Sequence, residues 1–262
     1  CTDNLSAPEI ALPGENFNPV IYTGDGASTH AITGVGYQPD LVWMKKRASG
    51  NGAHTVLDTI RGTDSWLETN GTDGAQLNPP NPSALDSFDS DGFTTTSYGN
   101  VNSSGNTFVA WSWKAGGAPT ADNSAGAGAT PTAGSVKIDG ANLGSALAGS
   151  IAATRLSANT TAGFSIVTYT GNLTSGATVA HGLGTAPDLI IVKVLNASRN
   201  WGIGSDHLTG SSWEKYLQFT TGAELDNVNM FNDTAPSSSI FTIGNNTDIN
   251  GSGDTYVAYC FN

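Results

Sequence analysis

Positive charge is scarce in this chain of 262 residues. It holds 10 Lys and Arg residues against 22 Asp and Glu residues, so its net charge at neutral pH is −12. A protein without a basic stripe cannot neutralise a phosphate backbone, and an anionic membrane surface repels it. We therefore expect neither a nucleic acid nor a membrane as a partner.

Long apolar runs are also lacking. No run approaches the ~18 consecutive apolar residues of a membrane-spanning helix, and no long stretch has the period of an amphipathic helix. Hydrophobic residues still make up 38% of the chain, and Gly, Ser, Thr and Asn dominate the polar remainder. That composition is typical of short strands joined by many turns, so it predicts an all-β protein.

Only two cysteines occur, Cys1 and Cys260. Two are too few for a disulfide framework in a chain of this length. The sequence favours two unpaired thiols but does not decide whether they pair. Cys260 alternates with Ala258 on a strand face of small residues beside an aromatic one, which indicates a packing role and not a nucleophile.

One pattern is written twice in the chain. Each copy has an aromatic-led strand ending in Tyr-Thr-Gly, a Gly-x-Gly turn, and Pro-Asp before an apolar strand that ends in Lys. The four segments are residues 17–24, 34–45, 164–171 and 182–193. Lys45 and Lys193 lie 148 positions apart, and the closing strands around Phe108 and Tyr256 keep that spacing. Regularly spaced short strands with turn signals predict two tandem antiparallel, jelly-roll-like β-sandwich domains.

The repeat spacing divides the chain into four parts. We expect a linker at 1–16, the first repeat at 17–117, a partly ordered connection rich in Gly, Ala and Thr at 118–162, and the second repeat at 163–262. Within the connection, residues 135–138 predict a short strand and residues 147–156 a short helix.

Three local patterns predict how the strands are used. The apolar run 41–44 suits a strand that is covered on both faces. Alternation in the closing strand places Phe108, Ala110 and Ser112 together on one face. The dipeptide Asp91-Gly92 predicts the turn of a hairpin over residues 88–93.

Residue types that carry catalysis show no repeated pattern. The four histidines are His30, His54, His181 and His207, and none has a histidine at the repeat spacing. No histidine pair has the spacing of a helical zinc site, and there is no CxxC. Each Gly-x-Gly turn has Pro in place of the third glycine and precedes a strand, whereas a dinucleotide site requires a helix there. We therefore predict a protein that is not an enzyme and needs no cofactor.

Two groups of residues remain as candidate binding sites. Trp66, Trp201 and Trp213 lie where the two copies diverge, so they could stack on a receptor sugar or pack on a partner; burial in a core is the competing interpretation. Asp86, Asp89 and Asp91 form a D-x-x-D-x-D-G cluster whose oxygens could hold Ca²⁺. The EF-hand spacing and its distal Glu are absent there, and a solvated turn is the alternative. The same carboxylates are too close in sequence to form a glycosidase pair across a cleft.

The doubled pattern resembles an uncharacterised repeat of structural proteins from tailed phages that infect marine bacteria. The resemblance rests on the motifs at 17–24 and 34–45, on Ser-Phe-Asp-Ser-Asp-Gly-Phe at 87–93, and on Phe-Val-Ala-Trp-Ser-Trp-Lys-Ala-Gly-Gly at 108–117. Segments 132–140 and 154–160 look like the same family, so the resemblance covers nearly the whole chain. In such proteins a SPRY-like domain often precedes a segment like residues 1–6, and we expect an upstream domain to be missing here.

The resemblance implies a virion component on the surface of an extracellular particle. The function that we expect is a non-enzymatic part of a tail fibre or spike that contributes to host-surface recognition. The alternatives are a capsid decoration or cement protein, whose acidic surface would keep particles apart, and a carbohydrate-binding or carbohydrate-active protein of a bacterial surface. Expected partners are other virion proteins, further copies of the chain in a trimer, and a cell-surface glycan.

Overall fold

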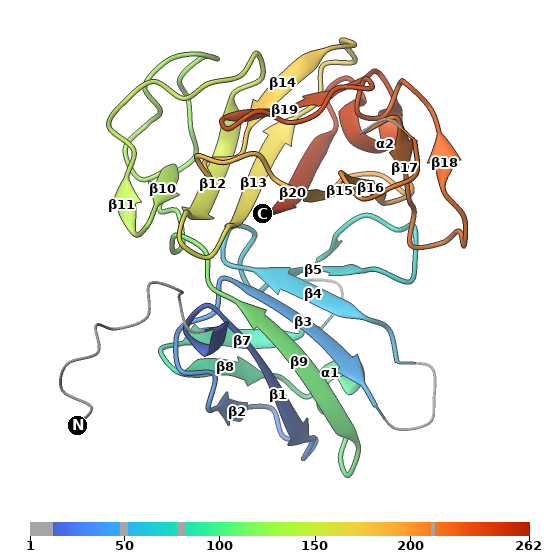
Figure 1. The fold of residues 1–262 in the computed structure, drawn as a ribbon. Helices are drawn as coiled ribbons and strands as arrows, with labels where there is room; N and C mark the ends of the chain where they lie inside the picture. Colours follow the sequence, from blue (N-terminus) through green and yellow to red (C-terminus); the bar gives the residue numbers. More distant parts are fainter. Residues whose placement is uncertain (1–12, 48–51, 78–81, 211–212) are drawn as a thin grey trace, which may run out of the picture.

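A computed structural model describes residues 13–47, 52–77, 82–210 and 213–262 of the chain. Regular structure in these ranges is almost all β-strand, as the composition predicts (Figure 1). Two one-turn helices, α1 (Gly99–Asn102) and α2 (Thr247–Asn250), occupy matching places in the two repeats. No helix in the described ranges is long and apolar enough to cross a membrane. The fold is two tandem antiparallel β-sandwich domains.

The first repeat packs a six-stranded sheet on a three-stranded sheet. The large sheet has the order β1-β9-β3-β4-β5-β6, with β1 (Phe17–Thr23), β9 (Thr107–Trp113), β3 (Leu41–Lys46), β4 (Thr55–Asp58), β5 (Ser65–Glu68) and β6 (Gln76–Leu77). The small sheet has the order β2-β8-β7, with β2 (His30–Thr33), β8 (Gly92–Thr95) and β7 (Leu85–Asp89). Apolar side chains between these sheets, including Val42, Met44, Phe93 and Phe108, form the first core.

The second repeat repeats this plan with a wider large sheet. That sheet has the order β11-β10-β12-β13-β20-β15-β16, with β11 (Ala141–Asn142), β10 (Val136–Ile138), β12 (Ala153–Asn159), β13 (Phe164–Thr170), β20 (Thr255–Phe261), β15 (Leu189–Val194) and β16 (Gly202–Ser205). Facing it are β14 (Ala177–Ala180) and β19 (Ile240–Ile243), while β17 (Lys215–Tyr216) and β18 (Leu225–Asp226) form a separate ribbon. The second core lies between the two layers and contains Cys260, which is fully buried. Cys1 lies outside the described residues.

The connection between the repeats is largely strand. The strand predicted at 135–138 is confirmed as β10, which pairs in parallel with β12. The helix predicted at 147–156 is wrong, because Gly149 and Ile151 make β-bridges to Val179 and β12 begins at Ala153. An unpaired edge of β13 would leave a row of main-chain donors and acceptors open. Pairing with β12 provides hydrogen-bond partners for these main-chain groups. The stabilisation from this pairing outweighs the weak helix preference of residues 147–156. Of the predicted linker, residues 13–15 form a 3₁₀ turn, η1 (Pro13–Glu15).

Both copies of the doubled pattern serve the same packing. Tyr22 stacks on Phe108 and Tyr169 stacks on Tyr256, each pair with ring centroids 5.2 Å apart. The glycine of Tyr-Thr-Gly is required by close approach: a Cβ on Gly24 would lie 2.5 Å from a main-chain oxygen of the loop after α1. The alternation predicted for β9 is confirmed, since Phe108, Ala110 and Ser112 are all fully buried.

The hairpin predicted over residues 88–93 is confirmed as β7 and β8, with a shifted turn. Gly92 pairs with Asp89, so the two turn residues are Ser90 and Asp91 instead of Asp91 and Gly92. Gly92 is needed one position later because a Cβ there would lie 2.0 Å from the main-chain oxygen of Ile32 on β2.

The two large sheets pack on each other through their outer faces, and this contact forms a third core. Its members include Leu41, Val56 and Leu67 from the first repeat and Ile166, Ile191, Val257 and Tyr259 from the second. The prediction that 41–44 is covered on both faces is confirmed, because Val42 and Met44 face the first core and Leu41 faces the third. The protein is thus a stack of four β-layers, with β3, β4 and β5 facing the second repeat (Figure 1).

Candidate functional site

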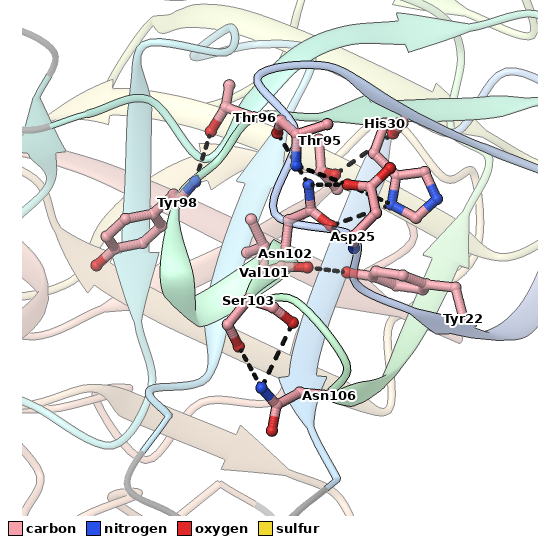
Figure 2. Close-up of polar contacts among 11 residues, drawn as sticks. Tyr22, Asp25, His30, Thr95, Thr96, Tyr98, Val101, Asn102, Ser103 and Asn106 are labelled. Atoms are coloured by element: carbon pink, nitrogen blue, oxygen red, sulfur yellow. Dashed lines mark hydrogen bonds and ion pairs between the residues drawn. The ribbon is translucent and has the colours of Figure 1, made fainter.

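A polar cluster surrounds the buried side chain of Asn102 in the first repeat (Figure 2). Its Oδ1 accepts a hydrogen bond from the main-chain N–H of Asp25 at 3.0 Å. Its Nδ2 donates to Asp25 Oδ1 at 3.0 Å and to the main-chain oxygen of Ala27 at 3.1 Å. The Tyr22 hydroxyl donates to the main-chain oxygen of Val101 at 2.7 Å. Together these bonds tie the loop after β1 to α1.

The second repeat builds the same corner from its own residues. Asn250 Oδ1 accepts from the N–H of Asn172 at 2.9 Å, and its Nδ2 donates to the oxygen of Thr174 at 3.0 Å. The Tyr169 hydroxyl donates to the oxygen of Ile249 at 2.7 Å. A buried amide has to be hydrogen-bonded, and both repeats meet this need with an equivalent asparagine. We therefore assign the polar cluster around Asn102 to the scaffold of the fold.

The four histidines occupy four different environments. His30 Nδ1 lies 3.0 Å from Asn102 Oδ1. His54 Nδ1 accepts a hydrogen bond from the indole of Trp43 at 3.0 Å. His181 is buried in the second Gly-x-Gly turn, where burial lowers its pKa. His207 is exposed. These settings differ from copy to copy, as their unmatched positions in the sequence indicate.

The three tryptophans proposed as binding residues are buried, so the prediction that they present a stacking surface is wrong in this conformation. Trp66 is 1% exposed, Trp201 is 1% exposed and Trp213 is 2% exposed. They belong to the first, third and second core respectively. Burying an aromatic ring of this size is strongly favourable, and the competing interpretation of core packing holds.

The predicted calcium cluster does not form. Asp89 accepts hydrogen bonds from the hydroxyls of Ser87 and Thr94, each at 2.7 Å. Asp91 accepts from the two glycine N–H groups of the Gly34-x-Gly36 turn at 3.1 and 2.7 Å, and Asp86 is exposed. No three His, Cys, Asp or Glu side chains converge as metal ligands in the part of the chain that the structure describes. The carboxylates serve separate turns.

A buried charged network crosses the joint between the repeats. Arg61 Nε donates to Asp58 Oδ2 at 2.7 Å, and Nη2 donates to the Tyr259 hydroxyl at 3.1 Å. The Tyr259 hydroxyl in turn donates to Asp58 Oδ2 at 2.8 Å. The side chains of Arg61 and Asp58 are 4% and 0% exposed. Asp58 ends β4 of the first repeat, Arg61 lies in the turn after it and Tyr259 lies on β20 of the second repeat, so the network joins the two repeats.

The lysine that ends the doubled strand is also used within the scaffold. Lys193 is fully buried, donates to the main-chain oxygens of Thr72 and Arg199, and lies 5.8 Å from the ring centroid of Trp201. Burial lowers its pKa to about 8. Thr72 belongs to the first repeat, so this lysine too joins the repeats. Lys45 donates in the same manner to the main-chain oxygen of Gly52.

The candidate site is a large open space, which we call the connection cleft. It has a volume of about 1130 Å³ and is lined by residues from segments 15–16, 36–40, 114–118, 137–140 and 159–161, together with Ser90. The cleft therefore lies where the first repeat meets the connection. Sequence reasoning missed it, because its lining comes from five separate segments and only the tertiary structure brings them together.

Buried hydrogen bonds hold the lining in place. Asp40 Oδ2 accepts from the N–H groups of Ala115 and Gly117 at 2.8 and 3.2 Å, and Asp40 Oδ1 accepts from the Thr59 hydroxyl at 2.9 Å. Burial raises the pKa of Asp40. On the connection side, Asn159 Nδ2 donates to Asn16 Oδ1 at 3.0 Å. Hydrogen bonds thus hold the frame of the cleft in both of its halves.

Other polar groups of the cleft face solvent. Glu15, Gln38 and Lys114 are exposed and Lys137 is half-buried. No hydrogen bond or ion pair engages these four side chains within the described ranges. The Lys114 ammonium lies 5.9 Å from the ring centroid of Tyr37, whose hydroxyl donates to the main-chain oxygen of Ser112 at 2.7 Å. A ligand in the cleft would meet two cations, an amide and the exposed carboxylates of Glu15 and Asp139.

The second repeat does not repeat this lining. At the repeat spacing, Tyr37, Gln38 and Lys114 become Thr185, Ala186 and Asn262. Asn262 Nδ2 donates to the main-chain oxygen of Ala186 at 2.6 Å, so this polar group is used internally. The free polar groups of the connection cleft are therefore particular to the first copy.

Comparison with known proteins places the chain in a family. The family described as Domain of unknown function (DUF7483) matches residues 12–140 and again residues 128–262. The chain belongs to this family. It carries the domain twice, which confirms the duplicated uncharacterised domain that the sequence pattern predicts. No curated protein and no solved structure matched the chain.

Proposed function

We propose that this DUF7483 protein is a non-enzymatic structural component of a tailed-phage particle, within a tail fibre or spike that contributes to host-surface recognition. The motifs it shares with structural proteins of marine tailed phages support the phage origin. A SPRY-like upstream domain and a location on the virion surface belong to the same proposal.

The observation that carries the proposal is the contrast between the two copies. Polar residues present in both copies, such as Asn102 and Asn250, make hydrogen bonds that stabilise the fold. Polar residues at the connection cleft, such as Gln38 and Lys114, are free and occur in the first copy alone. Free polar groups on a rigid frame are suited to recognition, because binding then costs little ordering of the protein.

The contacts between the two repeats also support a mechanical role in an appendage. A fibre module has to transmit force between its ends, and here the third core and the Asp58–Arg61–Tyr259 network connect the repeats. A fibre implies several copies of the chain side by side. We propose a homotrimer that also contacts other virion proteins.

A capsid decoration protein is the second candidate, and the net charge of −12 favours it. An acidic surface would keep neighbouring particles apart through charge repulsion. The two candidates differ in where the chain sits on the particle and in what it binds, either the host surface or the assembled shell.

Electron microscopy of virions labelled with antibody against this chain separates the candidates. Label on the tail is expected for the fibre or spike, and label on the head would favour decoration. Label on neither would overturn the virion proposal and favour a protein of the bacterial surface. As a functional readout, excess purified chain should slow adsorption of the phage to its host.

A further inference from the structure

We infer that the connection cleft binds a carboxylate-bearing sugar unit of a surface polysaccharide. The inference rests on the proposed role in host-surface recognition and adds to it the site and the charge of the ligand.

Most basic side chains in the described ranges already have partners. Ion pairs join Arg61, Arg155, Arg199 and Lys215 to Asp58, Asp122, Asp254 and Asp226. Lys45 and Lys193 donate to main-chain oxygens. Lys46, Arg47, Lys114 and Lys137 make neither kind of contact within the described residues, and of these four Lys114 and Lys137 line the connection cleft.

The acidic groups of the cleft compete little for these two lysines. Asp139 accepts from the N–H and the hydroxyl of Thr160 at 2.8 and 2.6 Å, so each of its oxygens is engaged. Asp40 is buried and holds three donors, and the nearby charge of Lys114 favours its ionised form without a direct ion pair. Glu15 remains as an exposed carboxylate of the lining. The ammonium groups of Lys114 and Lys137 are therefore available to an anionic ligand, and charge-assisted hydrogen bonds are the strong ones.

The rest of the lining indicates a sugar. Gln38 offers an amide and Thr161 a hydroxyl, and these groups suit the hydroxyls of a pyranose. A volume of about 1130 Å³ exceeds the range of roughly 300–1,000 Å³ that holds a small ligand, so the cleft has room for several linked units. The two cations of the lining can each contact the carboxylate of one uronate unit.

Binding of defined oligosaccharides to the full chain tests the inference. The probes are tetragalacturonic acid and a tetramer of mannuronic acid, with maltotetraose as the neutral probe, and calorimetry measures the affinity. We expect at least one uronate tetramer to bind, more weakly as salt is raised, and maltotetraose not to bind. Equal affinity for the neutral tetramer, or binding of neither uronate, overturns the inference.

Substitutions assign the binding to the cleft. Lys114→Gln and Lys137→Gln should each lower the affinity about tenfold or more, since each removes a charge-assisted contact. Lys46→Gln is the matched control, because Lys46 is partly exposed at the end of β3 and does not line the cleft. Unfolding curves of all three variants verify folding. An equal loss in Lys46→Gln, or no loss in the two cleft variants, refutes the site.

Phage adsorption separates this inference from the proposed function. If the wild-type chain slows adsorption and the Lys114→Gln/Lys137→Gln chain does not, both stand. If both chains slow adsorption equally, host recognition stands and the connection cleft is not its site. If neither chain slows adsorption, the proposed role in host recognition fails, and calorimetry alone then decides whether the connection cleft binds a uronate.

Discussion

Removing the guanidinium of Arg61 should loosen the joint between the two repeats. The Arg61 side chain donates to Asp58, to Tyr259 across the joint, and to the main-chain oxygens of Val56 and Ser65 at 3.2 and 3.3 Å. In Arg61→Met the aliphatic stem keeps its packing, but the Asp58 carboxylate stays fully buried without its cation.

The expected cost follows from the donors that Asp58 keeps. Breaking a buried ion pair by removing one partner costs about 3–5 kcal/mol. Asp58 retains the Tyr259 hydroxyl at 2.8 Å and the main-chain N–H of residue 61 at 2.9 Å. We therefore expect a loss near the lower limit, about 3 kcal/mol of the free energy of unfolding. Tyr259→Phe removes a hydroxyl alone and should cost less, about 1–2 kcal/mol.

Urea unfolding at neutral pH, followed by tryptophan fluorescence, measures these changes. Lys215→Met is the control, because the pair that Lys215 makes with Asp226 at 2.6 Å has an Asp side chain 65% exposed. Such an exposed pair should contribute little to stability, because water and salt screen it. The double variant Asp58→Asn/Arg61→Met should be more stable than Arg61→Met, because it has no buried, unpaired carboxylate at position 58.

Two results would refute the reasoning. A loss in Arg61→Met no larger than in Lys215→Met would mean that the buried network does not hold the joint. A double variant less stable than Arg61→Met would mean that the Asp58 carboxylate is not the source of the cost. A changed m-value would indicate separate unfolding of the two repeats, and each transition would then be fitted alone.

Three further predictions concern other parts of the scaffold. Asn102→Ala and Asn250→Ala should each cost about 2–4 kcal/mol in urea unfolding, because each buried amide makes at least three hydrogen bonds; a large effect in one repeat and none in the other would contradict their equivalence. Burial lowers the pKa of Lys193 from 10.5 to about 8, so the folded chain binds fewer protons than the unfolded chain between these values. Relative to Lys193→Met, the stability of the wild type should rise from pH 7.5 to 9.5, approaching about 3 kcal/mol in full; a flat difference in melting temperature would contradict this. Burial raises the pKa of the Cys260 thiol to about 12. In a Cys1→Ser variant this thiol should therefore react with an aromatic disulfide reagent only as the chain unfolds, and fast labelling of the native protein would count against it.

Strand identity and strand faces could be predicted because they depend on local periodicity. The alternation around Phe108 assigns the core face of β9, and the apolar run 41–44 indicates a strand buried on both sides. Neither pattern predicts which part of the protein covers these strand faces. Leu41 looks the same in sequence whether its neighbour is a helix, a second chain or, as here, the large sheet of the other repeat.

The tryptophan prediction failed for a related reason. Trp66, Trp201 and Trp213 lie where the two copies differ, and divergence in sequence suggests exposure. Each core has its own shape, however, so two copies of one fold can fill their cores with different side chains. Divergence at these positions accompanies a change of packing partner.

The duplicated pattern by itself determined that this is a tandem β-sandwich protein, since turn glycines, alternating strands and a fixed spacing act through near neighbours in the chain. The tertiary structure decided how the repeats meet, which strands of the connection complete the second sheet, and where free polar groups gather. Those outcomes depend on contacts between distant segments, such as Arg61 with Tyr259 and Asn16 with Asn159. No local pattern encodes such contacts, because their energy comes from burying faces that the chain brings together only when it folds.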